Sequence, residues 1–199
     1  MPNTDLWLYA VHSAFWGSFG LTKALARRPS SAAPDANPPR AGTQATAPHS
    51  RSLLLVHMIA FGLMYYGVGN TVLPNRVPSW FPGQRMLGFL VITVGAAFMC
   101  WALLYFRSWR FRAQLDAGHE LASGGPFRYV RHPIYLGLNL LALGTAIWVP
   151  TALTWIAALM MVIGSDLRGR AEEGLLRQVF GDTYAAYCAR TSRFLPGVY

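Results

Sequence analysis

The chain has 199 residues, of which 53% are hydrophobic and 13% are charged, and its formal net charge is +9. An ordinary soluble domain has about 25% charged residues, so this composition excludes a typical water-soluble protein and indicates a membrane protein. The positive charge would also suit a nucleic-acid-binding protein, but the basic residues flank long apolar runs. That arrangement is typical of membrane proteins, and we expect no nucleic-acid partner.

Four apolar segments follow one another along the chain. Residues 6–21 are the weakest candidate for a membrane helix, whereas 53–73 and 86–106 are each 21 residues long without Asp, Glu, Lys or Arg. About 20 apolar residues span the hydrocarbon core, so each of these two runs predicts one crossing. Residues 134–165 form a 32-residue charge-free run with Pro150 near the middle, which predicts a hairpin of two short helices.

The segments together predict an all-α fold, a polytopic integral membrane helical bundle with about five transmembrane helices and a C-terminal helical hairpin. We divide the chain into N-terminal transmembrane helices at 1–106 and a C-terminal region at 107–199 that contains the hairpin 134–165. Residues 27–51 are rich in Pro, Ala and Ser and lack a periodic apolar face. They predict a disordered cytoplasmic loop.

Basic residues are unevenly distributed between the apolar runs. Five lie before the second run, two between the second and third, five between the third run and the hairpin, and five after the hairpin. The positive-inside rule then places the N-terminus outside. The 22–52 loop, the 107–133 segment and the C-terminus are expected in the cytoplasm.

Polar residues that could carry chemistry gather at both ends of the hairpin. Because a hairpin brings its ends together, the residues at its start should face those that follow it. The first group contains His119, Gly125, Arg131, His132 and Tyr135, and the second contains Arg168, Glu172 and Glu173. Beyond them, Gly181 is expected to end a helix, with a short helix at 183–190 after it.

Each of these features has a plainer alternative. The Gly124-Gly125-Pro126 turn could present backbone amides to an anionic or polar group, or it could be a turn whose neighbours meet lipid headgroups. Arg168 and Glu172, four residues apart, could form an ordinary surface ion pair. Acids at a membrane boundary are costly, however, and a cationic ligand would explain them.

Two histidines, His12 and His57, lie within predicted membrane helices, where hydrogen bonding to a neighbouring helix is the simplest role. Cys100 and Cys188 have no metal-ligand spacing and are not expected to pair. No two His or Cys residues show the spacing of metal ligands, so we expect no metal.

The run GHELASGGPFRYVRHPIYLG, the hydrophobic hairpin and RAEEGLLRQVFGDTYAAYCARTSRFLP together resemble the isoprenylcysteine carboxyl methyltransferase family. The signature Arg-His-Pro-x-Tyr, an apolar stretch and Glu-Glu is shared with phospholipid methyltransferases. The resemblance covers residues 107–199. It implies an S-adenosylmethionine-dependent methyltransferase, multi-pass in the cell inner membrane, with a cytoplasmic cofactor pocket under the hairpin.

The resemblance also implies roles for individual residues. The cofactor S-adenosyl-L-methionine would be bound by His119, Glu120, Leu121, Ala122, Phe127, His132, Pro133, Ile134, Tyr135 and Glu172. The catalytic residues would be Arg168, Glu172 and His132, with Glu172 on the cofactor's amino group and Arg168 on the substrate carboxylate. Familiar members have Tyr at position 127, so Phe127 lacks a phenol hydrogen bond.

The implied reaction is carboxyl O-methylation of a lipophilic, isoprenylcysteine-like or prenylated substrate that arrives from the membrane lipid. A carboxylate is already ionised, so it needs a cation to orient it rather than a base. One alternative acceptor is a phospholipid amine or a small thiol, and an amine would demand a base such as His132 or Glu173. Remoter alternatives are an NADPH-dependent sterol-type reductase, whose ending the tail YCARTSRFLPGVY resembles, and a non-enzymatic membrane protein.

Overall fold

The computed structural model describes residues 4–26, 45–46, 50–105, 114–115 and 121–199. The α-helices in these residues are α1 (Trp7–Ala26), α2 (Ser50–Val72), α3 (Gln84–Tyr105), α4 (Pro133–Trp148) and α5 (Ala152–Arg190). Two short 3-10 helices, η1 (Thr4–Leu6) and η2 (Gly125–Arg128), accompany them. The strands β1 (Ala45–Thr46) and β2 (Gln114–Leu115) form a small antiparallel pair. Most of the predicted loop at 27–51 lies outside the described residues.

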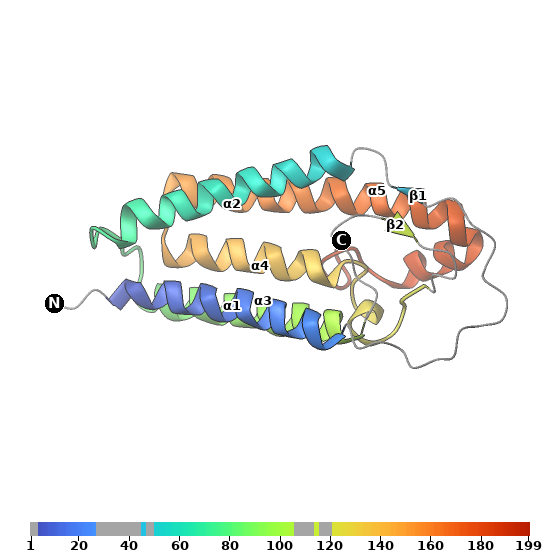
Figure 1. Ribbon diagram of the computed structural model, residues 1–199, viewed down its shortest axis with the longest axis horizontal. Helices are drawn as coiled ribbons and strands as arrows, with labels where there is room; N and C mark the ends of the chain where they lie inside the picture. Colours follow the sequence, from blue (N-terminus) through green and yellow to red (C-terminus); the bar gives the residue numbers. More distant parts are fainter. Residues whose placement is uncertain (1–3, 27–44, 47–49, 106–113, 116–120) are drawn as a thin grey trace.

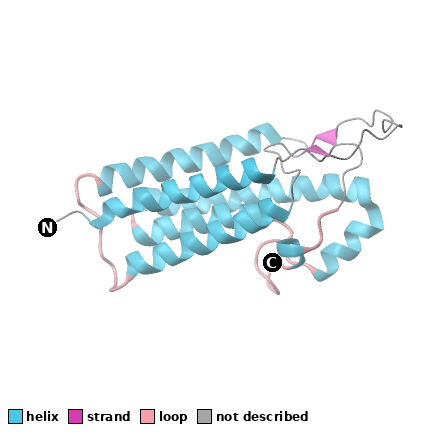
Figure 2. Ribbon diagram, turned by 60° about the horizontal axis from the view of Figure 1, so that its bottom comes forward, coloured by secondary structure: helices cyan, strands magenta, loops and turns pink. Residues whose placement is uncertain are grey.

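The long helices run side by side along the longest axis of the molecule (Figures 1 and 2). In Figure 1, α2 and α5 lie together on one side, α1 and α3 on the other, and α4 between them, in contact with α3 and α5. Within the described part of the chain, α2, α3 and α5 are long and apolar enough to cross a membrane, and α4 is apolar but shorter. The predicted all-α membrane bundle is confirmed.

Glycines allow α3 and α4 to pack with their backbones close together. A Cβ added at Gly144 would lie 2.7 Å from the carbonyl oxygen of Gly88, and one added at Gly95 would lie 2.9 Å from that of Gly137. Seven residues separate the two glycines on each helix, so each pair faces the partner helix. Such close packing holds membrane helices together where no hydrophobic force acts between them.

The two histidines within the helices bond to neighbouring helices, as predicted. His12 Nε2 lies 2.9 Å from Thr145 Oγ1, and its Nδ1 lies 3.1 Å from the hydroxyl of Tyr65. His57 Nε2 lies 3.2 Å from Ser165 Oγ. These contacts tie α1 to both α2 and α4, and α2 to α5.

Asp5 joins three elements at the end of the bundle where α4 terminates. Arg85 donates to both of its carboxylate oxygens, with Nη2 at 2.9 Å from Oδ2, and Trp148 Nε1 donates to Oδ1 at 2.9 Å. Burial raises the pKa of Asp5, but the hydrogen bonds from Arg85 and Trp148 outweigh it and hold this pKa below its usual value. Asp5 therefore fastens the start of the chain to α3 and α4.

The predicted hairpin is present, with its turn at Pro150. Thr151 begins α5 with a capping box, in which its side chain accepts from the Thr154 amide and Thr154 accepts in return. Its second arm differs from the prediction, because α5 continues past residue 165. The backbone of α5 stays helical through Gly169 and Gly174 and departs from helical angles at Gly181, which has φ +50° and kinks the helix. The last stretch to Arg190 then turns back, which confirms the predicted break (Figure 1).

Candidate active site

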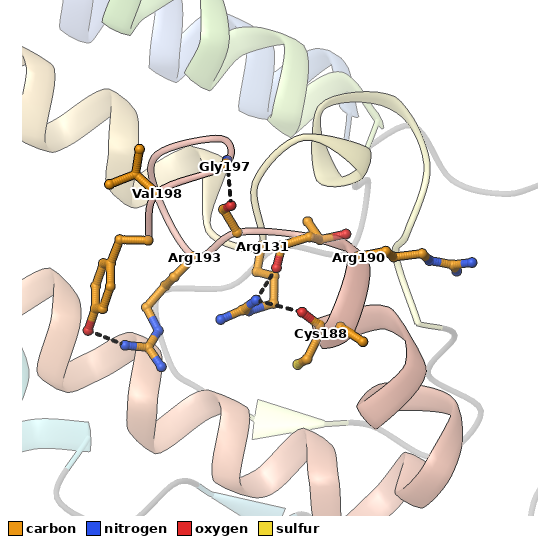
Figure 3. A pocket seen from close by; sticks show the side chains of 10 residues that line it. Arg131, Cys188, Arg190, Arg193, Gly197 and Val198 are labelled. Carbon is orange, nitrogen blue, oxygen red and sulfur yellow. Dashed lines mark hydrogen bonds between the residues drawn. The ribbon is translucent and has the colours of Figure 1, made fainter.

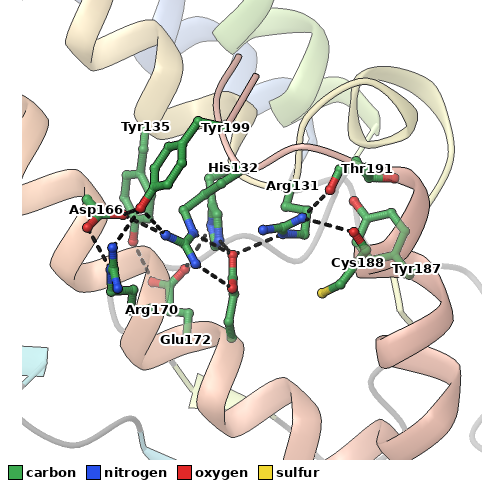
Figure 4. A network of polar contacts seen from close by, with 12 residues as sticks. Arg131, His132, Tyr135, Asp166, Arg170, Glu172, Tyr187, Cys188, Thr191 and Tyr199 are labelled. Atoms are coloured by element: carbon green, nitrogen blue, oxygen red, sulfur yellow. Dashed lines mark hydrogen bonds and ion pairs between the residues drawn. The ribbon is translucent and has the colours of Figure 1, made fainter. Parts of the chain in front are cut away.

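The start of α4 meets α5 and the C-terminal segment, residues 191–199, at one end of the bundle. Pro133 opens α4, where a missing backbone N–H costs nothing. The C-terminal segment runs alongside, because the Arg131 amide donates to Ser192 O at 2.8 Å and the His132 amide donates to Arg193 O at 3.2 Å. Three separate pieces of chain therefore enclose one polar cluster (Figure 4).

Glu173 is the buried centre of this cluster. None of its side chain is exposed. It accepts hydrogen bonds from Arg131 Nε at 3.0 Å and from Arg193 Nε and Nη2 at 2.9 and 3.0 Å, and His132 Nε2 lies 3.2 Å away. A buried carboxylate is stable only with such partners. The hydrogen bonds to Glu173 in turn raise the pKa of Arg193, although burial opposes them.

Glu172, the adjacent acid, faces a different set of side chains. The Tyr135 hydroxyl donates to its Oε1, Arg168 Nε lies 3.4 Å from the same oxygen, and His132 Nδ1 lies 3.6 Å from Oε2. The guanidinium of Arg168 stands 5.5 Å from the centre of the Tyr135 ring. The Glu172 side chain is 22% exposed. Glu172 is therefore the acid that a ligand can reach, whereas Glu173 is enclosed.

The predicted meeting of the two hairpin ends is confirmed for most of the residues involved. The structure brings together Arg131, His132, Tyr135, Arg168, Glu172 and Glu173. His119 and Glu120 lie outside the described residues. The cluster thus contains His132, Arg168 and Glu172, the three residues for which the family resemblance implies a catalytic role.

The turn before α4 packs against α3 instead of joining the charges. A Cβ added at Gly124 or Gly125 would lie 2.0 or 2.5 Å from Tyr105, so the close approach of that side chain accounts for both glycines. Gly125 also has φ +56°, a conformation that favours glycine. Phe127 is buried with its ring centre 6.2 Å from that of Tyr105. These contacts favour a packing role for the turn over an anion-binding one.

The other described residues that were predicted to bind the cofactor are apolar and at least partly buried. Leu121 and Ala122 are half-buried, and Ala122 packs against the apolar core. Pro133 and Ile134 are buried in the first turn of α4, and Ile134 belongs to the same core. Pro133 and Ile134 therefore anchor the helical turn that carries Tyr135.

A polar layer separates the charged cluster from the apolar middle of the bundle. Ser165 Oγ donates to Asn139 Oδ1 at 2.8 Å and lies 3.2 Å from His57 Nε2. The ring of His57 stands 6.0 Å from that of Tyr135. Asn139 and Tyr135 lie four residues apart on one face of α4, as the sequence indicated.

The C-terminal segment contributes two side chains that were not predicted from the residue pattern, Arg193 and Tyr199. Arg193 Nη1 donates to Asp166 Oδ1 at 2.7 Å, and the Tyr199 hydroxyl donates to the same oxygen at 2.8 Å. Arg170 Nη2 donates to that hydroxyl at 2.7 Å. The sequence offered only a weak indication of these residues, because the segment lacks a helical period and an arginine near the chain end is common at a membrane surface.

An open cavity of about 460 Å³ lies beside the cluster, between the C-terminal segment and the end of α5 (Figure 3). Its lining includes Arg131, Arg193, Cys188 and Arg190. Arg131 and Arg193 also bond to Glu173. The two guanidiniums that neutralise the buried acid therefore border open space as well.

Comparison with known proteins identifies the family. The sequence profile described as phospholipid methyltransferase matches residues 84–183, which is half of the chain and contains α3, α4 and the residues of α5 that build the cluster. The chain belongs to the phospholipid methyltransferase family. In the part of the chain that the structure describes, three helices are long and apolar enough to cross a membrane, and the protein is therefore an integral membrane methyltransferase. Family membership argues against the reductase and the non-enzymatic alternatives.

Two curated relatives are similar over a larger part of the chain. Both carry the description "Probable protein-S-isoprenylcysteine O-methyltransferase", one from Oryza sativa subsp. indica and one from Oryza sativa subsp. japonica. Each is 26% identical over 142 residues, which cover 69% of this chain and 73% of the relative. Together with the phospholipid methyltransferase profile, they place this chain among membrane methyltransferases of the isoprenylcysteine and phospholipid type.

Proposed function

We propose that this membrane methyltransferase uses S-adenosylmethionine to methylate the carboxylate of a lipophilic acceptor of the isoprenylcysteine type. The observation that carries the proposal is Arg168, a guanidinium only 6% exposed that stands over Tyr135 where the charge-free part of α5 ends. A buried cation at this level can align an anionic head group whose apolar tail stays among the membrane helices.

The residues present fit the proposed methyl donor. Its amino group needs a reachable carboxylate, which Glu172 offers, and its sulfonium suits the aromatic faces of Tyr135 and His132, whose rings are stacked 5.7 Å apart. When bound, S-adenosylmethionine would supply a methyl group to an acceptor oxygen in line, with S-adenosylhomocysteine leaving as the carbon–sulfur bond breaks. Glu172 would hold the donor's ammonium and Arg168 would aim the acceptor carboxylate. Alignment of this kind lowers a barrier by about 7–11 kcal/mol in favourable cases.

The surroundings of Glu173 favour a carboxylate acceptor over an amine. An amine must lose a proton before it can attack, whereas a carboxylate is ionised above about pH 5 and needs no base. Glu173 is a poor candidate for that base, because its oxygens already accept from Arg131 and Arg193. We therefore expect the rate to be flat with pH above about pH 6, whereas an amine acceptor would give a rising profile.

The same proposal includes the orientation of the site. The uneven distribution of basic residues supports an N-terminus outside and a cluster on the cytoplasmic side, where a soluble donor is available. The acceptor would then reach Arg168 from the membrane, and the donor would reach Glu172 from the cytoplasm.

The proposal is tested with the full chain in lipid nanodiscs. Binding of S-adenosylhomocysteine is measured by calorimetry, and transfer of labelled methyl is measured with farnesylated cysteine, phosphatidylethanolamine and total membrane lipid. We expect label on farnesylated cysteine. Absence of any binding would overturn the choice of donor, and label only on phosphatidylethanolamine would overturn the choice of acceptor.

Arg168→Gln is the decisive variant for the acceptor. It removes the cation that aims the carboxylate, so the KM for farnesylated cysteine should rise by about tenfold or more while S-adenosylhomocysteine still binds. Arg76→Gln makes the same chemical change at an exposed position in the connection between α2 and α3, and it should leave both the KM and S-adenosylhomocysteine binding unchanged. Equal behaviour of the two variants would remove Arg168 from the acceptor site.

A further inference from the structure

The C-terminal segment holds His132 from several directions. The His132 amide donates to the carbonyl of Arg193, and the ring of Phe194 lies 5.9 Å from the imidazole ring. On the opposite element, a Cβ added at Gly169 would lie 3.2 Å from His132 Nε2 and 3.6 Å from Arg193 Cδ. Because Gly169 has no side chain, the side chains of His132 and Arg193 can both pack against α5 at this position.

Arg193 also occupies both carboxylate oxygens of Glu173. Its Nε and Nη2 take both carboxylate oxygens in a bidentate pair, and its Nη1 reaches Asp166 at 2.7 Å. Arg177 makes a fourth contact with Glu173, at 3.5 Å, but its side chain is 57% exposed. Of the cations around Glu173, Arg193 alone both pairs bidentately with the acid and bonds His132 through its main chain, among the residues that the structure describes.

We propose that Arg193 is a positioning residue of the active site, which acts on His132 through Glu173 and through its own carbonyl. The inference rests on the proposed function, because it concerns the donor that His132 and Glu172 would bind. With Arg193 in place, Glu173 is neutralised and His132 stays between the two acids. Without it, Glu173 draws the imidazole toward itself and away from Glu172, and the wall of the donor site shifts.

The experiment compares donor binding and acceptor use in the full chain. Arg193→Gln should weaken S-adenosylhomocysteine binding by about tenfold, as expected for a lost hydrogen-bonded charge pair, while the KM for the acceptor stays within about twofold of wild type. Arg193→Lys keeps the charge but not the bidentate pair, so its affinity for S-adenosylhomocysteine should lie between those of wild type and Arg193→Gln. Arg177→Gln removes an exposed cation from the same acid and should change binding by no more than about twofold.

A double variant tests whether Arg193 acts through Glu173. If it does, adding Arg193→Gln to Glu173→Gln should weaken donor binding no further than Glu173→Gln alone. If the Glu173→Gln protein does not fold, the single variants test the positioning role. Donor affinity should then fall in the order wild type, Arg193→Lys, Arg193→Gln. A merely structural role would instead lower the melting temperature and weaken donor and acceptor together.

The outcomes separate the two proposals. If wild-type protein binds no S-adenosylhomocysteine, the proposed function fails, and the positioning role falls with it. If wild type binds but Arg193→Gln equals Arg177→Gln, only the positioning role is overturned. An additive double variant would overturn the route through Glu173.

Discussion

Two adjacent glutamates with the same chemistry occupy opposite environments in this site. Glu173 is fully enclosed and bonded to Arg131 and Arg193, whereas Glu172 is partly exposed and bonded to Tyr135. Helix geometry turns consecutive side chains about 100° apart, so one acid points toward the C-terminal segment and the other toward α4. At this scale we infer a structural role for Glu173 and a ligand-binding role for Glu172.

The two glutamates can be tested against each other, because the same substitution at each is the control for the other. Glu172→Gln should keep the melting temperature and weaken S-adenosylhomocysteine binding by about tenfold. Glu173→Gln should lower stability by roughly 3 kcal/mol, because Arg131 and Arg193 lose their counter-charge. Thermal unfolding in detergent and calorimetry measure both effects. A stable Glu173→Gln protein would contradict this assignment.

At the scale of elements, the site depends on how α4 is held between α3 and α5. At Gly88 and Gly144 there is no room for a side chain between α3 and α4, so the two helix backbones pack directly against each other. The contact fixes the position of α4 and therefore of Tyr135 at its start. The long α5 then carries Arg168 and Glu172 past that same end of α4.

Gly144→Ala tests this helix contact. The added Cβ would lie 2.7 Å from the Gly88 carbonyl oxygen, and neither backbone can move without disturbing the bundle. We expect a loss of about 1–3 kcal/mol in stability, as for other overpacked sites. Gly62→Ala is the matched control, because a Cβ at that position in α2 would meet nothing within 4 Å. Equal thermal unfolding of the two variants in detergent would contradict the close-packing interpretation.

At the scale of the whole molecule, the two ends of the bundle have different characters. One end is fastened by Asp5, Arg85 and Trp148, and the other carries the polar cluster and the C-terminal segment. If the positive-inside rule holds, the first end faces outward and the cluster faces the cytoplasm.

Cysteine labelling in whole cells tests this orientation. Ser79→Cys, in the exposed connection between α2 and α3, should react with a membrane-impermeant maleimide in intact cells. Asp182→Cys, exposed beside the kink of α5, should react only after the cells are permeabilised. Both are made with Cys100 and Cys188 replaced by Ala. The reverse pattern would place the cluster outside and refute a cytoplasmic donor site.

Much of this architecture was predictable from the order of residues. Charge-free runs predicted the membrane helices, Pro150 predicted the hairpin turn, and Gly181 predicted the break in α5. These features depend on local composition and backbone restrictions, which act over a few residues. The convergence of His132 with Glu172 was predictable too, because a hairpin joins its ends.

Only the tertiary structure distinguished Glu172 from Glu173 and revealed Arg193 as a partner of the site. The local sequence does not show which of two adjacent acidic residues is buried. Burial depends on the side chains from other segments that pack against each residue. Arg193 follows Glu173 by 20 residues, across the kink at Gly181. The sequence alone determined the bundle and the hairpin, whereas the partners of each charge follow from the path of the chain after Gly181 and could not be predicted from residue order.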